Sequence, residues 1–316
     1  MSKKKKKSPL NKTIDFNLEE GTPYIKRCID LKAFDKELLT ETNKTIIGDF
    51  FEAIQIIPNE SVDLLIVDPP YNLTKEYHGN RYAKTTSEKY HIYTEEWIVA
   101  LKEKLKPSGT IYVCCDWCSS LIIGVELMKH FNVRNRITWQ REKGRGAKTN
   151  WKNSIEDIWY ATQSNEFTFN LDAVKERRQV LAPYRVEGEP KDWEETSKGK
   201  FRDTCPSNFW NDITIPFWSM PENTAHPTQK PEKLIAKLIL ASSNEGDVVL
   251  DPFLGSGTTS VVAKKLNRQY IGIEQNPLYC AWAEKRLEIA DEDNSIQGYT
   301  DGVFWERNTL AFQKQK

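Results

Sequence analysis

Residues 68–72 read Asp-Pro-Pro-Tyr-Asn and combine groups that could hold and activate an amino group. An amine on an aromatic ring is a poor nucleophile, because its lone pair is delocalised into the ring. The Asp68 carboxylate and the Pro69 carbonyl could accept hydrogen bonds from its two N–H groups and so localise the lone pair. The Tyr71 ring could stack on a nucleic-acid base, a contact worth about 1–3 kcal/mol. Pro69 and Pro70 fix an extended turn, and a strand-ending turn capped by Asp68 is the alternative interpretation.

Residues 251–259 (DPFLGSGTT) form a glycine loop between an apolar strand pattern and a helical pattern. Glycines let the backbone approach a ligand closely, and the N–H groups at a helix N-terminus suit a carboxylate. The loop is not a P-loop, because no lysine follows its second glycine, and it lacks the third glycine of a dinucleotide fingerprint. An ordinary glycine-containing turn is the alternative.

Two further segments could contact the ligand that the glycine loop is expected to bind. Glu274 ends the strand pattern that follows the glycine loop, where an acid is placed to bind ribose hydroxyls. A surface glutamate at a strand end is the alternative. Residues 226–231 (HPTQKP) precede a helical pattern, and we interpret His226, Thr228 and Lys230 as contacts to the ligand's carboxylate. A lone histidine is more often structural, but here three polar side chains gather at one helix entry.

In this combination the motifs resemble the amino-methyltransferase family of DNA methyltransferases. Residues 68–71 match its catalytic tetrapeptide, residues 253–257 its Phe-x-Gly-x-Gly donor loop, and residues 226–231 the segment that precedes that loop in many members. The resemblance covers roughly 45–161 and 221–290. The catalytic motif comes before the donor loop, which is the order of the family's β group, a circular permutation with the target-recognition segment between the two halves.

The resemblance implies transfer of a methyl group from S-adenosylmethionine to N6 of an adenine flipped out of duplex DNA. Asp rather than Ser at position 68 favours adenine N6 over cytosine N4 in this family, and cytosine N4 stays open as the alternative. RNA or protein amine methylation is less compatible, because protein-glutamine enzymes with a related motif usually carry the donor loop upstream. A DNA-binding regulator on an inactive fold should lack a motif, and all are present.

The resemblance also implies roles for individual residues. The expected catalytic residues are Asp68, Pro69, Pro70 and Tyr71. The residues expected to bind S-adenosylmethionine are Asp49, His226, Thr228, Lys230, Asp251, Phe253, Gly255, Gly257, Thr258 and Glu274. For Asp49 we favour a contact on the adenine side of the donor over a helix-capping role.

A basic stripe between Arg134 and Lys152 could contact DNA. It holds seven basic residues and one acid, Glu142, and within it Trp139 and Trp151 flank a loop that contains Gly144 and Gly146. Such a loop suits phosphates and groove edges, and a solvated run of charge is the alternative. The expected DNA contacts are Arg141, Lys143, Arg145, Lys148 and Lys152.

The elements that position these residues are those of an α/β protein. Strands are expected at 45–47, 62–67, 110–115 (after a turn at 107–109), 132–139, 155–161, 247–250 and 269–273, and helices at 92–105, 119–130, 231–243, 257–267 and 277–290. Continuous apolar strands separated by helices imply a parallel sheet covered on both faces. We therefore predict a doubly wound, mostly parallel, Rossmann-like methyltransferase sheet in circularly permuted order, with an inserted target-recognition region.

The chain divides into five expected segments. They are an N-terminal extension (1–44), the catalytic half of the methyltransferase domain (45–163), the inserted target-recognition region (164–225), the S-adenosylmethionine-binding half of the same domain (226–290) and a C-terminal tail (291–316). The insertion is rich in charge, Trp, Pro and Asn, so we expect it to have little core of its own. The polar tail is expected to pack loosely.

Composition indicates a chain with a packed interior and argues against a membrane span, a secretory signal and a cysteine-based metal site. The 316 residues are 39% hydrophobic, enough for a packed interior, and 45 basic residues balance 45 acidic ones. No apolar run reaches the length of a bilayer span, and the lysines at 3–7 lack the apolar segment of a secretory signal. A solvated tail is the preferred interpretation of these lysines, with a nucleic-acid arm or nuclear address as alternatives. The six cysteines lack zinc-ligand spacing, so we expect free thiols and no metal site.

The expected partner is double-stranded DNA, with no membrane contact. The resemblance leaves room for a homodimer and for a cognate restriction endonuclease. The protein is expected in the cytoplasm, associated with the nucleoid through DNA.

Overall fold

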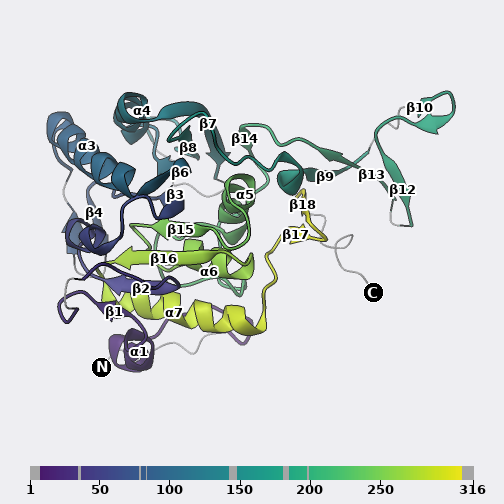
Figure 1. Cartoon of the computed structure of the whole chain (residues 1–316). Coiled ribbons are helices and arrows are strands. Elements are labelled where there is room, and N and C mark those ends of the chain that lie inside the picture. Colours follow the sequence, from purple (N-terminus) through teal and green to yellow (C-terminus); the bar gives the residue numbers. More distant parts are fainter. Residues whose placement is uncertain are drawn as a thin grey trace.

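The computed structural model describes residues 8–34, 37–77, 80–82, 84–141, 148–180, 185–197 and 199–307. Its centre is a nine-stranded sheet (Figure 1). In spatial order the strands are β1 (Ile29–Asp30), β2 (Lys44–Ile47), β16 (Gln269–Glu274), β15 (Val248–Asp251), β3 (Val62–Val67), β6 (Leu105–Cys115), β8 (Ile155–Thr162), β7 (Asn132–Gln140) and β14 (Phe209–Trp210). Neighbours are parallel except that β8 is antiparallel to β6 and β7. The predicted mostly parallel sheet is confirmed.

Two apolar cores, one on each face, hold this sheet. In β3, Leu64 and Ile66 belong to one core, and Leu65 and Val67 belong to the other. Successive side chains of a strand point to opposite faces, so an uninterrupted apolar strand serves both cores. This explains why the central strands show no polar alternation in the sequence.

Helices cover both faces, as a doubly wound fold requires. The first core is closed by α5 (Glu232–Ser242), α6 (Thr258–Lys265) and the end of α7 (Pro277–Glu292). The second core is closed by α2 (Phe50–Ala53), η1 (Ile54–Ile56), α3 (Ser87–Lys104) and α4 (Ser119–His130). No helix in the described ranges is both long and apolar enough to cross a membrane.

A smaller five-stranded sheet is built from the insertion and the C-terminal tail. Its order is β12 (Glu194–Thr196), β13 (Gly199–Thr204), β9 (Glu176–Gln179), β18 (Val303–Trp305) and β17 (Tyr299–Thr300). Figure 1 shows its strands β9, β13 and β12 extending away from the main sheet. The remaining elements are η2 (Leu171–Val174) and the short pairs β4 (Lys75–Tyr77) with β5 (Asn80–Tyr82) and β10 (Arg185–Val186) with β11 (Glu189–Pro190).

The prediction of a loosely packed tail is wrong for residues 296–305. Strand β18 pairs in parallel with β9, with Phe304 opposite Glu176. Phe304 is fully buried, and Trp305 is 6% exposed. The aromatic side chains of the tail supply the apolar surface that holds this strand.

The N-terminal extension contains one helix that the sequence analysis did not predict, α1 (Leu18–Ile25). It begins with a capping box, in which Asn17 and Glu20 exchange side-chain-to-backbone hydrogen bonds of 2.9 Å. Gly21 faces α7 so closely that a Cβ atom there would lie 2.9 Å from that of Ala281. The extension therefore packs on α7.

Candidate active site

A cavity of about 490 Å³ opens where the parallel strands end. Its lining comes from the segments that follow β2, β3, β15 and β16, from α3, and from the stretch before α5. The carboxyl ends of the strands in an open α/β sheet are where such folds bind ligands. The predicted site residues that line it are Asp49, Asp68, Pro69, Pro70, Tyr71, His226, Thr228, Lys230, Phe253, Gly255 and Glu274.

The two carboxylate oxygens of Asp68 each accept a hydrogen bond. The Tyr71 hydroxyl donates to Oδ1 over 2.7 Å, and the Lys230 ammonium donates to Oδ2 over 2.5 Å. The Lys230 ammonium also lies 5.7 Å from the centre of the Tyr71 ring. Burial raises the pKa of Tyr71, and the neighbouring Asp68 raises it further, so this hydroxyl stays a donor.

Lys230 is buried between two acids. Its ammonium lies 2.5 Å from Asp68 Oδ2 and 3.4 Å from Glu156 Oε2, and the residue is 9% exposed. Burial lowers the pKa of Lys230, but the attraction of Asp68 and Glu156 outweighs burial and raises it. The sequence analysis expected this lysine to contact the donor's carboxylate, and in the structure it contacts the Asp68 carboxylate.

The sequence analysis did not single out Glu156, which lines the same cavity. It lies on β8, is 5% exposed, and forms an ion pair with Arg141 through Oε1. The available signal was a pair of adjacent acids, Glu156 and Asp157, inside an otherwise apolar strand. Both are buried, and a buried carboxylate must have a partner.

The glycine loop places one glycine at the cavity and one against a helix. Gly255 has φ +55, and a Cβ atom there would lie 3.2 Å from the His226 ring. Its N–H donates to Glu274 Oε2 over 2.9 Å. Gly257 has φ +83, and a Cβ atom there would lie 2.5 Å from that of Ala283 on α7. Gly255 therefore shapes the cavity, while Gly257 lets two helices approach.

Asp251 and Thr258 do not line the large cavity. They border a small cavity of about 40 Å³ beneath the loop. Asp251 accepts the Phe253 N–H over 3.0 Å and the Thr259 hydroxyl over 2.5 Å. Burial raises the pKa of Asp251 to about 7. The Thr258 hydroxyl bonds the Lys230 carbonyl over 3.1 Å, so both residues hold the loop in shape.

Two acids, Glu274 and Asp49, face the cavity from neighbouring strand ends. Each oxygen of Glu274 accepts a backbone N–H, from Gly255 and from Asn276 over 2.8 Å. Burial raises the pKa of Glu274 to about 7. Asp49 caps α2 by accepting the Phe51 N–H over 2.9 Å. Its capping role is therefore present, and it lines the cavity as well.

An aromatic wall, of which the sequence analysis predicted only Phe253, completes the cavity. The rings of Phe50 and Phe253 lie 5.1 Å apart, and those of Phe51 and Tyr93 lie 6.0 Å apart. These four residues line the cavity. Phe253 was predicted from its motif, but Phe50, Phe51 and Tyr93 gave no signal, because aromatic residues beside strands are usually core residues.

The basic stripe is only partly described. Lys143 and Arg145 lie outside the described residues. Lys148 and Lys152 are exposed, and Trp151 between them is 93% exposed. Arg141 forms an ion pair with Glu156, which lines the cavity.

Comparisons with known proteins agree with this geometry. A family model described as DNA methylase matches residues 62–285. The Type II methyltransferase M.HpaI of Haemophilus parainfluenzae is 37% identical over 250 residues, which cover 78% of this chain and 74% of that protein. The DNA adenine methyltransferase YhdJ of Escherichia coli (strain K12) is 36% identical over 256 residues, covering 78% and 83%.

Solved structures share the fold. The cytosine-N4-specific PvuII DNA methyltransferase superposes with a TM-score of 0.61 at 19% identity, covering 81% of this chain and 92% of that one. The complex of M1.HpyAVI with S-adenosylmethionine gives 0.50 at 24% identity, covering 77% and 98%.

Proposed function

The chain belongs to the family of N6/N4 DNA methylases, and we propose that it transfers a methyl group from S-adenosylmethionine to N6 of an adenine flipped out of duplex DNA. The observation that carries this proposal is that Asp68 and Glu274 line the same cavity at the carboxyl ends of the strands. The named activity of YhdJ, which is 36% identical, supports adenine.

The residues present fit S-adenosylmethionine, which supplies an electrophilic methyl group when bound. Glu274 ends the strand after the glycine loop, where its oxygens can accept from ribose hydroxyls. Phe50 and Phe253 offer apolar ring surface for an adenine. The Gly255 backbone and His226 lie together at the loop, on the side where a carboxylate would bind.

We assign Asp68 as an acceptor for the target amine. In the structure, the Tyr71 hydroxyl donates to Asp68 Oδ1 and the Lys230 ammonium donates to Oδ2. An incoming amine would take the place of the neutral Tyr71 hydroxyl more easily than that of the ammonium. The released Tyr71 ring could then stack on the flipped base, while the Pro69 carbonyl accepts the second N–H.

We assign Lys230 and Glu156 as positioning residues for Asp68. The ammonium fixes the orientation of the Asp68 carboxylate through their ion pair. Glu156 balances the charge of Lys230 and is itself held by Arg141. Because Arg141 belongs to the basic stripe, a DNA phosphate there would compete with Glu156 for its guanidinium. This would connect DNA contact to the orientation of Asp68.

The remaining assignments rest on the same resemblance. We propose that 164–225 forms the target-recognition region between the catalytic half (45–163) and the donor half (226–290), and that Lys148 and Lys152 contact phosphates. We further propose a cognate restriction endonuclease, a homodimer and association with the nucleoid. The Type II designation of M.HpaI supports the endonuclease.

Modification mapping tests the proposed reaction. A plasmid is incubated with the protein and S-adenosylmethionine, and the modified base and its sequence context are then read. N6-methyladenine within one short sequence is the expected product. N4-methylcytosine would replace the adenine assignment, and no modified base with Asp68 intact would refute the proposal.

A further inference from the structure

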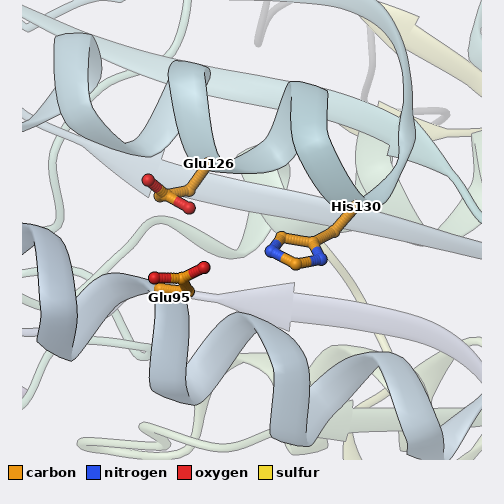
Figure 2. Close-up of side chains that lie close together, drawn as sticks. All are labelled: Glu95, Glu126 and His130. Carbon is orange, nitrogen blue, oxygen red and sulfur yellow. The ribbon is translucent and has the colours of Figure 1, made fainter.

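Three metal-ligating side chains converge between α3 and α4, outside the active-site cavity. Glu95 projects from α3, and Glu126 and His130 project from α4 (Figure 2). One ligand atom from each residue lies within 4.8 Å of the others. Glu126 and His130 are one helical turn apart and therefore face the same side. Figure 2 shows all three side chains pointing into the gap between the helices.

Two polar atoms of this cluster are buried without a hydrogen-bond partner among the described residues. They are Glu126 Oε2 and His130 Nε2. Glu126 is fully buried at 0% exposed. Leaving a buried carboxylate oxygen unpaired is costly, and a cation or a set of donors normally satisfies it. The cluster thus has free ligand capacity directed at one point.

The other oxygen of Glu126 is fully occupied. Lys129 donates to Oε1 over 2.7 Å, and the His91 ring is in contact with the same oxygen. Ligating carboxylates are commonly oriented by such partners. Lys129 and His91 hold Glu126 by one oxygen, so that the second is presented to the gap.

We propose that Glu95, Glu126 and His130 bind a zinc ion. One imidazole and two carboxylates suit Zn²⁺, whereas Mg²⁺ and Ca²⁺ prefer oxygen ligands alone. Tetrahedral ligand atoms lie about 3.3 Å apart at zinc–ligand bonds near 2.05 Å. Side-chain rotation would close the present separations, which are within 4.8 Å. Three protein ligands leave the fourth position to water.

The bound ion would join α3 to α4. Tyr90 and Tyr93, on the same stretch of α3 as Glu95, line the active-site cavity. Zinc would therefore stabilise one wall of the cavity without taking part in methyl transfer. The role is structural, and its test requires neither DNA nor the methyl donor.

Cobalt absorption gives the direct test. The full-length protein is stripped with a chelator and titrated with Co²⁺, followed by displacement with Zn²⁺. One Co²⁺ per chain is expected, with visible d–d bands and no thiolate charge-transfer band. His130→Ala should abolish these bands. The matched control Glu96→Gln, an exposed acid next to Glu95 on the same helix, should retain them.

Two outcomes would overturn the site. Either the wild-type protein binds no Co²⁺, or His130→Ala binds it as the wild type does. Because His130→Ala could disturb packing, Glu95→Gln and His91→Ala are measured as well, with circular dichroism to report folding. Glu95→Gln should remove the rise in Tm that Zn²⁺ produces. His91→Ala, which removes an orienting partner, should weaken Zn²⁺ binding by about 10–100-fold. Unchanged Zn²⁺ effects in both folded variants would also exclude this site.

Discussion

Asp68 is predicted to act as a hydrogen-bond acceptor and not as a strong base. Asp68→Ala should lower the single-turnover rate of methylation by about 10²–10³-fold, the loss typical of one preorganised polar contact. DNA affinity should survive, because phosphate contacts supply most of it. Rapid-quench methylation and a binding titration on one duplex measure the two effects. Full activity in Asp68→Ala would remove this residue from the chemistry.

Tyr71→Ala serves as the comparison, since it removes stacking but leaves Asp68 in place. Its loss should be partly rescued on a duplex with a mismatched target base, because extrusion then costs less. Equal loss on paired and mismatched duplexes would contradict the stacking role.

Glu274 should make donor binding depend on pH, because burial raises its pKa to about 7. If the ionised form accepts from ribose, affinity for S-adenosylmethionine should rise about tenfold from pH 6 to pH 8. The contribution of Glu274 to folding stability changes with pH in the opposite direction to donor affinity. A raised carboxyl pKa favours the folded state below the unfolded pKa, and this contribution is lost as pH rises from about 4.5 to about 7.

Glu274→Gln should flatten both pH profiles, as measured by calorimetry and by thermal unfolding. Asp251→Asn is the control for binding, because Asp251 has a pKa raised to about 7 by burial but does not line the large cavity. A pH dependence of binding that persists in Glu274→Gln would assign the titration to another group.

At this scale, the motif residues were predictable and their partners were not. Asp68, Gly255 and Glu274 lie at the cavity because motif chemistry and strand ends determine their positions. The contact of Lys230 with Asp68 joins residues 162 positions apart. No local sequence pattern encodes such a pair. The sequence analysis therefore predicted that Lys230 contacts the donor, and it did not identify Glu156.

Among the elements, the glycine loop allows a prediction with a matched control. Gly255→Val places a side chain against His226 at a backbone position with φ +55, so S-adenosylmethionine binding should be lost. Gly246→Val introduces similar backbone strain at φ +86, but no atom lies within 4 Å of its Cβ position. This control should lose stability and keep donor affinity. Calorimetry that finds wild-type affinity in Gly255→Val would contradict the loop's assignment.

The exposed end of the basic stripe should contribute to DNA binding through charge. Replacing both Lys148 and Lys152 with Ala should reduce the salt slope of DNA affinity by about 2, since each phosphate contact contributes about 0.9. Lys26 and Lys32, exposed near the opposite edge of the sheet, are the control pair. Fluorescence anisotropy at several salt concentrations measures the slopes. An unaltered slope would place the DNA surface elsewhere.

Element boundaries followed from the sequence wherever apolar periodicity was strong. Strand β3 begins and ends as predicted. Strand β6 begins earlier than predicted, at Leu105. Its pairing with β3 shifts register after Val62, and the residues of the predicted turn at 107–109 lie in this irregular part of the strand. Helix α1 was overlooked because it spans only eight residues and contains Gly21 and Pro23, which are poor helix formers.

At the scale of the whole molecule, the smaller sheet joins strands of the insertion (β9, β12 and β13) to strands of the C-terminal tail (β17 and β18). Phe304→Ala should destabilise this sheet by about 3–5 kcal/mol, the usual effect of deleting a buried aromatic side chain. The strands β9 and β13 should then become sensitive to limited proteolysis, while donor binding persists. Trp218→Ala, at a residue 50% exposed, is the control. Protection of β9 equal to that of the wild type would show that β18 does not hold this sheet.

The pairing of β18 with β9 has a consequence for engineering specificity. We call residues 176–204, which contain β9, β12 and β13, the arm. If the arm selects the DNA sequence, exchanging it alone between relatives would pair the transferred β9 with the recipient's own β18. The unit of exchange is therefore discontinuous, and residues 299–305 should be transferred together with 176–204. A library that recombines only the central segment would sample mostly mismatched hybrids, whereas one that varies both together would preserve the interface on which the arm rests.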